Sequence, residues 1–281
     1  MSMYRQARTG LRKVMQRVAR RWPDPRLMEN YKSLQMRLDS LRLVKNPPEG
    51  EGEFACVRPN SVDQRRLFRS GFNIAWIDEL GLTPKVIFDI GAYDGGDAVR
   101  FKQKFPNARV VSFEADPVRY AIVSDNVIPF DIQAVNAAVS ESDDRVEWYQ
   151  SRVAGEEGGI GGQGSRYRHS PGYRLKFASV QQSATPTTIK STRIDTFCRE
   201  AGISEIDLLH VDVEGAEYDV VCGLGSVRPR MIYLETTFGN WIGAKDPVHV
   251  HRKLSAMGCI LAADLPGNRL YVRADVAGCL S

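Results

Sequence analysis

A glycine-containing loop, residues 89–96, is the first segment of the chain whose residue types could bind a ligand. It reads Asp-Ile-Gly-Ala-Tyr-Asp-Gly-Gly and follows an apolar stretch. Glycines at such a point let the backbone pass close to a ligand and turn tightly into a helix. The spacing differs from the Gly-x-Gly-x-x-Gly of dinucleotide-binding folds, and Asp89 would repel a pyrophosphate but suit the cationic amino-acid end of S-adenosylmethionine. We predict cofactor contacts from Asp89, Gly91, Ala92, Tyr93, Asp94 and Gly95; a structural turn without a ligand is the alternative.

A second candidate, Glu114, ends the next apolar stretch, 23 residues after Gly91. A carboxylate at the end of the second strand of a βαβ unit can accept hydrogen bonds from both ribose hydroxyls of a nucleoside. A helix-capping or surface acid is the alternative. We also predict cofactor contacts from the neighbouring Ala115 and from Asn136 and Ala137, which end a third stretch where an adenine would lie, although Asn is also an ordinary turn residue.

Three more acids end the later strands of the predicted sheet. Asp212 ends the fourth strand, Glu214 comes directly after it, and Glu235 ends the fifth. Asp212 could orient a methyl donor or act as a base towards an acceptor hydroxyl, and Glu214 and Glu235 could share that task. Carboxylates can bind Mg²⁺, but the spacing of these three acids in the sequence does not require a metal ion, and we predict none. His210, in the middle of its strand, is expected to be a hydrogen-bonded core histidine.

These residues need elements to position them, and the chain supplies alternating strands and helices. Apolar stretches at 85–90, 109–114, 132–135, 206–213 and 230–235 predict strands. Helices are predicted at 61–80 and 97–104, from Asp116-Pro117, and from Ala216. The alternation predicts an α/β fold with a Rossmann-like, doubly wound, mostly parallel sheet. Residues 259–263 and 270–273 would add an antiparallel pair at its edge.

The charge divides the chain into two parts. Residues 1–48 hold twelve basic and three acidic residues, a local charge of +9, whereas the remainder holds 26 basic and 31 acidic residues. Apolar residues at helical spacing in the basic part, followed by Asn46-Pro47-Pro48, predict a helical N-terminal arm and linker over 1–50 and a catalytic domain over 51–281. The arm is interpreted as a solvated or docked helix, with an anionic membrane surface or an oligomer contact as alternatives.

A glycine-rich insertion at 155–176 interrupts the alternation. Residues 155–164 contain six glycines, and arginines and aromatic residues follow them. Arginine suits carboxylate or phosphate groups and aromatic rings suit sugars. The insertion could be a lid over the acceptor, with a disordered surface loop as the alternative.

Taken in order, several of these segments resemble the FkbM family of S-adenosylmethionine-dependent methyltransferases. The resemblance covers about residues 84–275 and rests on Val86–Gly96, Phe113–Pro117, Asn136–Ser140, Arg193–Phe197 and Leu208–Gly223, above all on Asp-Val-Glu-Gly-Ala-Glu at 212–217. It implies S-adenosyl-L-methionine as cofactor, with contacts from Asp89, Gly91 and Glu114. It also implies O-methylation of a hydroxyl on a sugar, a glycan or a polyketide-like secondary metabolite.

Two other functions share some of these features. A nucleotide-dependent oxidoreductase would share the fold and Glu114 but lacks its glycine spacing, and a non-catalytic scaffold would not need the acids of the later strands. The acidic catalytic part predicts no nucleic-acid partner. Five scattered cysteines without a Cys-x-x-Cys pair argue against a disulfide framework or a zinc site. With no apolar run near the ~20 residues that span a bilayer, we expect a cytoplasmic protein, or one held peripherally at a membrane.

Overall fold

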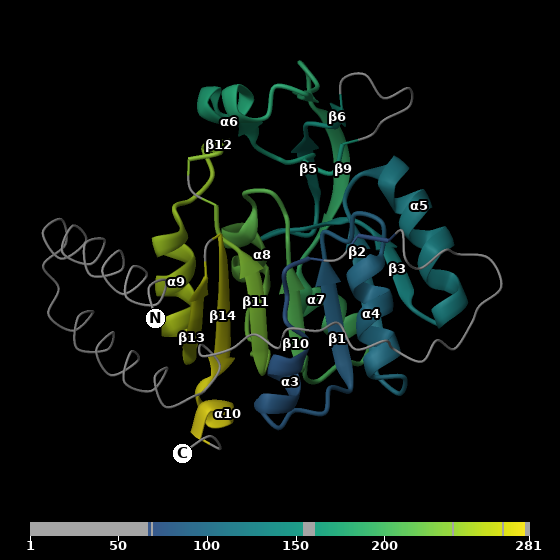
Figure 1. Cartoon of the computed structure of the whole chain (residues 1–281), viewed down its shortest axis with the longest axis vertical. Helices are drawn as coiled ribbons and strands as arrows, with labels where there is room; N and C mark the ends of the chain where they lie inside the picture. Colours follow the sequence, from purple (N-terminus) through teal and green to yellow (C-terminus); the bar gives the residue numbers. More distant parts are fainter. Residues whose placement is uncertain (1–66, 69, 154–160, 238, 266, 279–281) are drawn as a thin grey trace, which may run out of the picture. The chain divides into compact units, whose positions relative to one another are not determined.

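A seven-stranded sheet forms the centre of the computed structural model, which describes residues 67–68, 70–153, 161–237, 239–265 and 267–278 (Figure 1). Its strand order is β13-β14-β11-β10-β1-β2-β3. The parallel strands are β1 (Val86–Ile90), β2 (Arg109–Glu114), β3 (Gln133–Asn136), β10 (Leu208–Val211) and β11 (Met231–Glu235). The antiparallel edge pair is β13 (Cys259–Leu265) and β14 (Asn268–Arg273). The predicted fold class is confirmed.

The middle of the sheet is buried because helices cover a parallel sheet on both faces. Ile87 of β1 lies in register with Leu208 of β10 and Val110 of β2, and all three are at most 1% exposed. The strand order reverses between β1 and β10, and open α/β sheets bind ligands outside the carboxyl ends of the strands at such a point. The pocket is therefore expected beyond Ile90 and Val211.

Helices surround the sheet, and the sequence provides a side-chain cap for some of them. They are α3 (Ala75–Glu79), α4 (Gly96–Lys104), α5 (Pro117–Val127), α7 (Ile194–Glu200), α8 (Glu217–Gly223), α9 (Pro247–Ala256) and α10 (Ala274–Gly278), with a 3₁₀ turn, η2, at Ile128–Phe130. The Asp116 carboxylate accepts the Val118 and Arg119 N–H groups at the start of α5, with proline at the first helical position. The predicted start of this helix is confirmed.

One helix is shorter than predicted. A helix was expected over 61–80, but α3 contains only Ala75–Glu79, and residues 61–66 lie outside the described residues. The described backbone before α3 bonds to the side chains of α4 and of the loop before it: Ser70 N–H donates to Asp97 at 2.9 Å, and Arg100 donates to the Phe72 carbonyl. These tertiary hydrogen bonds replace the helical ones that local propensity predicted.

A second group of small elements lies beyond the carboxyl ends of the sheet and is called the cap (Figure 1). It comprises β4 (Ala138–Val139), β5 (Arg145–Trp148), β6 (Ser151–Val153), β7 (Arg168–His169), α6 (Pro171–Lys176), β8 (Val180–Gln182), β9 (Thr187–Thr192) and β12 (Trp241–Ile242). Strand β9 pairs with β4 and β5, β6 with β8, and β7 with β12. Of the predicted insertion at 155–176, the structure describes 161–176 and places it in the cap.

The predicted arm at 1–50 and its boundary at residue 51 lie outside the described residues. Within the described part of the chain, no helix is long and apolar enough to cross a membrane.

Candidate functional site

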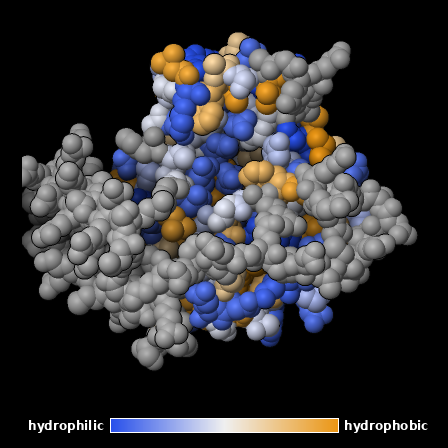
Figure 2. All heavy atoms as spheres, viewed as in Figure 1, coloured by the Kyte–Doolittle hydropathy of each residue, from blue (hydrophilic) through white to orange (hydrophobic). Residues whose placement is uncertain are grey.

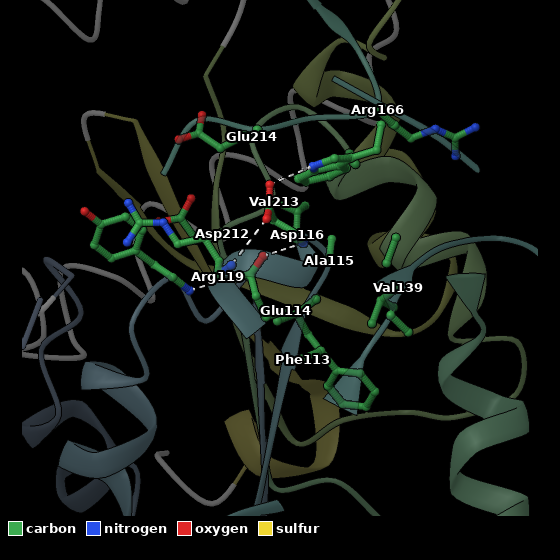
Figure 3. A pocket seen from close by; sticks show the side chains of 18 of the residues that line it. Phe113, Glu114, Ala115, Asp116, Arg119, Val139, Arg166, Asp212, Val213 and Glu214 are labelled. Carbon is green, nitrogen blue, oxygen red and sulfur yellow. Dashed lines mark hydrogen bonds between the residues drawn. The ribbon is translucent and has the colours of Figure 1, made fainter. Parts of the chain in front are cut away.

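A pocket lies between the carboxyl ends of the parallel strands and the cap (Figure 3). It opens to solvent, and the space between its walls, open solvent included, is about 690 Å³. The sheet side contributes Ile90, Gly91, Tyr93, Phe113, Glu114, Ala115, Asp116, Arg119, Asp212, Val213, Glu214 and Ala216. The cap side contributes Ala138, Val139, Val146, Trp148, Gly161, Gly162, Gly164 and Arg166, with Ala137 and Ser140 beside β4. The structure thus brings residues that were predicted to bind the cofactor together with residues that were predicted to be catalytic.

Gly91 allows two strand ends to approach each other. Its φ is +86°, and a Cβ atom built on it would lie 1.8 Å from the carbonyl oxygen of Asp212. Only glycine fits this backbone and this approach without strain. The loop then turns through Tyr93, whose φ is also positive, and the Tyr93 N–H donates to the Glu114 carboxylate at 2.9 Å.

The Glu114 carboxylate is buried at the floor of the pocket (Figure 3). Its Oε2 accepts the Tyr93 N–H and its Oε1 accepts the Asp116 N–H, each at 2.9 Å. Because an ionised carboxylate offers about four acceptor positions, it can accept two more hydrogen bonds from a ligand. Burial raises the pKa of Glu114 to about 7, although the two backbone donors oppose that shift. A ligand that donates hydrogen bonds to Glu114 would stabilise the ionised form of its carboxylate.

Asp89, by contrast, points into the core and does not line the pocket. It lies in register with His210 on β10 and with Ser112 on β2. Its Oδ1 is 2.8 Å from Nδ1 of His210, and Ser112 Oγ donates to its Oδ2 at 3.4 Å. His210 Nε2 is 3.2 Å from Ser70 Oγ, so the prediction of a hydrogen-bonded core histidine is confirmed. The role of Asp89 as a cofactor contact stays a prediction.

Other residues that were predicted to bind the cofactor do not line the pocket but hold its loops in place. Asp94 accepts the Phe68 and Gly96 N–H groups at 2.8 and 3.0 Å, which fixes the start of α4. The Asn136 amide donates to the carbonyl oxygens of Glu114 and Ala115 at 2.9 and 3.3 Å. The residues that support the loop without lining the pocket are Ala92, Asp94, Gly95 and Asn136.

Asp212, Glu214 and Glu235 form a carboxylate cluster at the pocket's edge. One carboxylate oxygen of each lies within 4.8 Å of the others. Burial, followed by the neighbouring acids, raises the pKa of Glu214 well above its usual value and that of Glu235 to about 9. Burial also raises the pKa of Asp212, although a hydrogen bond with Glu235 opposes the shift. At neutral pH Glu235 of the free cluster therefore keeps its proton, and a cationic ligand or a metal ion would favour its release. The absence of a metal stays a prediction.

The cap fixes the position of Glu214. The Ser165 hydroxyl donates to the Glu214 carbonyl oxygen at 2.7 Å, and Glu214 itself has a φ of 54°. Gly215 has a φ of +100°, and a Cβ atom there would lie 2.5 Å from the Trp241 ring. Burial, then Glu214 and Glu235, raises the pKa of Tyr173 in α6. The acids therefore face a surface built by the cap.

Sequence reasoning missed several pocket residues that the cap supplies. Trp148 of β5 is 9% exposed, and its Nε1 donates to Asp116 at 3.4 Å. Cβ atoms on Gly162 and Gly164 would lie 2.5 and 2.7 Å from the rings of Tyr93 and Trp148. The run of glycines is the signal in the sequence for this close packing.

The arginines of the predicted lid are also engaged within the protein. Arg166 Nη1 lies 3.0 Å from Asp219 Oδ2 and donates to Ser140 Oγ at 3.1 Å. The Tyr167 hydroxyl donates to the same Asp219 at 2.8 Å, and the Arg168 guanidinium lies 4.9 Å from the centre of the Tyr149 ring. Arg166 reaches the pocket wall, but its charge is balanced by Asp219. The role of the insertion as a lid stays a prediction.

Comparisons with known proteins match the same region of the chain. Residues 89–261 match the model of the Methyltransferase FkbM domain. The 2-O-methyltransferase NoeI of Sinorhizobium fredii is 35% identical over 153 residues, which are 53% of this chain and 62% of that protein. The methyltransferase sdnD of Sordaria araneosa is 28% identical over 154 residues, 49% of this chain and 60% of its own. The chain thus spans about 60% of the length of these curated relatives.

Solved structures are also similar to this chain. A crystal structure of methyltransferase FkbM from Methylobacillus flagellatus has a TM-score of 0.38 at 13% identity and covers 68% of this chain and 43% of its own. Cofactor-bound Rv0187 from MTB has a TM-score of 0.39 at 14% identity and covers 88% and 90%.

Proposed function

The chain belongs to the FkbM methyltransferase family, and we propose that it transfers the methyl group of S-adenosylmethionine to a hydroxyl group. The family uses this methyl donor. One observation carries the proposal. A single pocket joins Glu114, at the end of β2, to Asp212 and Glu214, after β10, across the Gly91 loop. A nucleoside-binding acid and a carboxylate cluster thus meet where one donor molecule can reach both.

The donor occupies the sheet side of the pocket in this proposal. The two free acceptor positions of Glu114 receive the ribose hydroxyls, and Ala137 and Trp148 border the space for the adenine. Asp212 and Glu214 face the cationic amino-acid end, where the positive charges of the donor favour their ionised forms. Gly91 contributes by keeping the path between these two groups free of a side chain.

The acceptor approaches from the carboxylate cluster. The hydroxyl oxygen attacks the donor's methyl carbon, a carbon–oxygen bond forms, the sulfur–carbon bond breaks, and the sulfur keeps the electron pair as a neutral thioether. The hydroxyl proton passes to a carboxylate, for which Asp212 is the first candidate because it lines the pocket and is hydrogen-bonded to Glu235. The remaining acceleration of the transfer comes from alignment of the hydroxyl oxygen with the methyl group and from exclusion of water.

Oxygen is the proposed acceptor atom for two reasons. The segment after β10 reads Asp-Val-Glu-Gly and lacks the Asn/Asp-Pro-Pro-Tyr/Phe type of loop that many amino-group methyltransferases carry there. The similar protein NoeI is named a 2-O-methyltransferase. We propose a hydroxyl of a sugar, a glycan or a secondary metabolite as the acceptor.

The proposal is tested by separating donor binding from transfer. Wild-type protein is expected to bind S-adenosylhomocysteine in calorimetry and to transfer labelled methyl groups to a member of a glycan and small-hydroxyl library. Asp212→Asn should lose most turnover even at saturating donor, a larger loss than its loss of donor affinity, whereas the exposed Asp125→Asn should change neither. Binding of NAD in place of S-adenosylhomocysteine would favour the oxidoreductase, and donor binding without transfer to any hydroxyl would favour a scaffold.

A further inference from the structure

Glu214 has a backbone conformation that residues other than glycine rarely adopt. Its φ is 54°, and Gly215, the next residue, has a φ of +100°. Among the described residues other than glycine, a positive φ occurs at Tyr93, Asp131 and Glu214, of which Tyr93 and Glu214 line the pocket. A residue with a Cβ atom keeps this left-handed conformation only where its surroundings hold it there. The contacts around Glu214 therefore help to shape the pocket.

The hydroxyl group of Ser165 holds Glu214 from the cap. It donates to the Glu214 carbonyl oxygen at 2.7 Å and accepts the Tyr167 N–H at 2.9 Å. Ser165 is fully buried, and its own N–H and carbonyl oxygen are both hydrogen-bonded to the backbone of the cap. The ring of Trp241 packs against the next residue, Gly215, where a Cβ atom would lie 2.5 Å from it. Two segments of the cap thus hold the turn at residues 214–215.

The Glu214 carboxylate belongs to the cluster with Asp212 and Glu235 because of this held backbone. Release to the ordinary right-handed region, at a φ of about −60°, would turn the Cα–Cβ bond of Glu214 and move its carboxylate away from the other two. Figure 2 shows hydrophilic residues where, in the same view, Figure 1 places the boundary between the cap and the sheet. Such a boundary can provide polar neighbours for a charged group of a ligand.

We propose that Ser165 is a positioning residue for the methyl donor, because it holds the Glu214 backbone so that the carboxylate meets the donor's ammonium group. This inference rests on the proposed function, in which Asp212 and Glu214 face the amino-acid end of the donor. Ser165 itself does not line the pocket, and it comes 49 residues before Glu214 in the chain. The glycine-rich insertion therefore contributes to donor recognition through a hydrogen bond to the backbone of another loop.

Calorimetry on the full chain at pH 8 compares two ligands that differ at this end. S-adenosylhomocysteine carries the ammonium group, and adenosine carries the same nucleoside without it. Ser165→Ala should weaken binding of S-adenosylhomocysteine about three- to tenfold, the effect of one disturbed hydrogen bond to a charged group, and leave adenosine binding within about twofold. Because general damage to the pocket would weaken both ligands together, the measured quantity is the ratio of the two affinities.

The matched control is Ser191→Ala in β9. Ser191 is 2% exposed, and its hydroxyl donates to the Ser142 carbonyl oxygen at 2.9 Å and accepts the Asp144 N–H at 3.1 Å. This variant loses a pair of hydrogen bonds of the same kind as Ser165→Ala, but neither of them involves Glu214. It should therefore keep the wild-type ratio of affinities.

Two further variants separate the positioning role of Ser165 from a general effect on folding. Ser165→Cys keeps the approximate size of the side chain but donates only weakly, so it should lower the ratio in the same direction. In a Glu214→Gln background, whose ratio is already low, Ser165→Ala should lower it no further.

An unchanged ratio in Ser165→Ala and Ser165→Cys would overturn the proposal. An equal fall in Ser191→Ala, or a further fall of the same size in the Glu214→Gln background, would do the same. Wild-type protein that binds neither ligand would instead overturn the proposed function, and this inference with it.

Discussion

Glu114 offers the sharpest test of the donor site, because burial raises its pKa to about 7. Ribose hydroxyls donate hydrogen bonds to an ionised carboxylate and lose them when that carboxylate is protonated. Nucleoside affinity should therefore be highest above pH 7 and fall as the pH drops. Between pH 8 and pH 5.5 the ionised fraction falls by about thirtyfold, which sets the upper limit of the loss in affinity.

Adenosine is the appropriate ligand because it carries the ribose hydroxyls but not the charged amino-acid end, which would also sense Asp212 and Glu214. Calorimetric titration across pH 5.5–8 should show the decline for the wild type and no decline for 2′,3′-dideoxyadenosine. Glu114→Gln should bind adenosine more weakly at pH 8 by about 1–3 kcal/mol and without dependence on pH. Its amide would also place a donor against one of two backbone N–H groups, those of Tyr93 and Asp116.

The stability of the free protein should also depend on pH through Glu114. Because the folded-state pKa of Glu114 is raised, its contribution to stability is fully present below its ordinary pKa and is lost as the pH rises through about 7. Bound ribose should offset that loss, so the rise in melting temperature caused by adenosine should grow with pH. Adenosine affinity that is constant over this range, or that declines equally in Glu114→Gln, would refute the reasoning.

Three further variants test the neighbouring structure. A left-handed backbone costs a residue with a Cβ atom about 1–2 kcal/mol, and Gly91→Ala should lower the free energy of unfolding by more than that because the new Cβ meets the Asp212 carbonyl. The control Gly81→Ala, at a φ of +63° with no atom within 4 Å, should lose only the backbone strain. Equal losses for the two variants in urea unfolding would argue against the clash. Trp148→Ala should lower the free energy of unfolding by about 3–5 kcal/mol and weaken the binding of S-adenosylhomocysteine. An unchanged midpoint of urea unfolding would show that the ring is not part of a packed core. Burial and Asp212 raise the pKa of Glu235 to about 9, so the stability of the wild type relative to Glu235→Gln should fall as the pH rises from 5 to 9, and a constant difference would contradict that shift.

The main strands and caps could be predicted because their signals are local. The strand predicted at 109–114 has those bounds, and Asp116-Pro117 begins α5 as expected. The positions of Glu114 and Asp212 in one pocket followed from a general rule, since the carboxyl ends of parallel strands meet at one edge of a sheet. The helix predicted from residue 61 was too long, because hydrogen bonds to Asp97 and Arg100 decide the backbone before α3.

The cap could not be predicted in this way. Trp148 reaches the pocket only because β5 pairs with β9, some forty residues further along the chain. The glycines after residue 160 indicated freedom of the backbone, but at Gly162 and Gly164 they make room for the rings of Tyr93 and Trp148. Local composition carries no information about which ring will occupy that room.

The sequence by itself determined the fold class and the presence of acids at the strand ends, since apolar periodicity, glycine spacing and caps act between near neighbours, and its ordered motifs resembled the family. Only the tertiary structure decided which acids face the pocket. Asp89 and Glu114 both come from strands that flank the same crevice, yet the register of β1 with β10 turns Asp89 towards His210 in the core. Glu114, the last residue of β2, remains in the pocket and accepts the Tyr93 N–H. Register depends on packing between strands far apart in the chain, and no local signal fixes it.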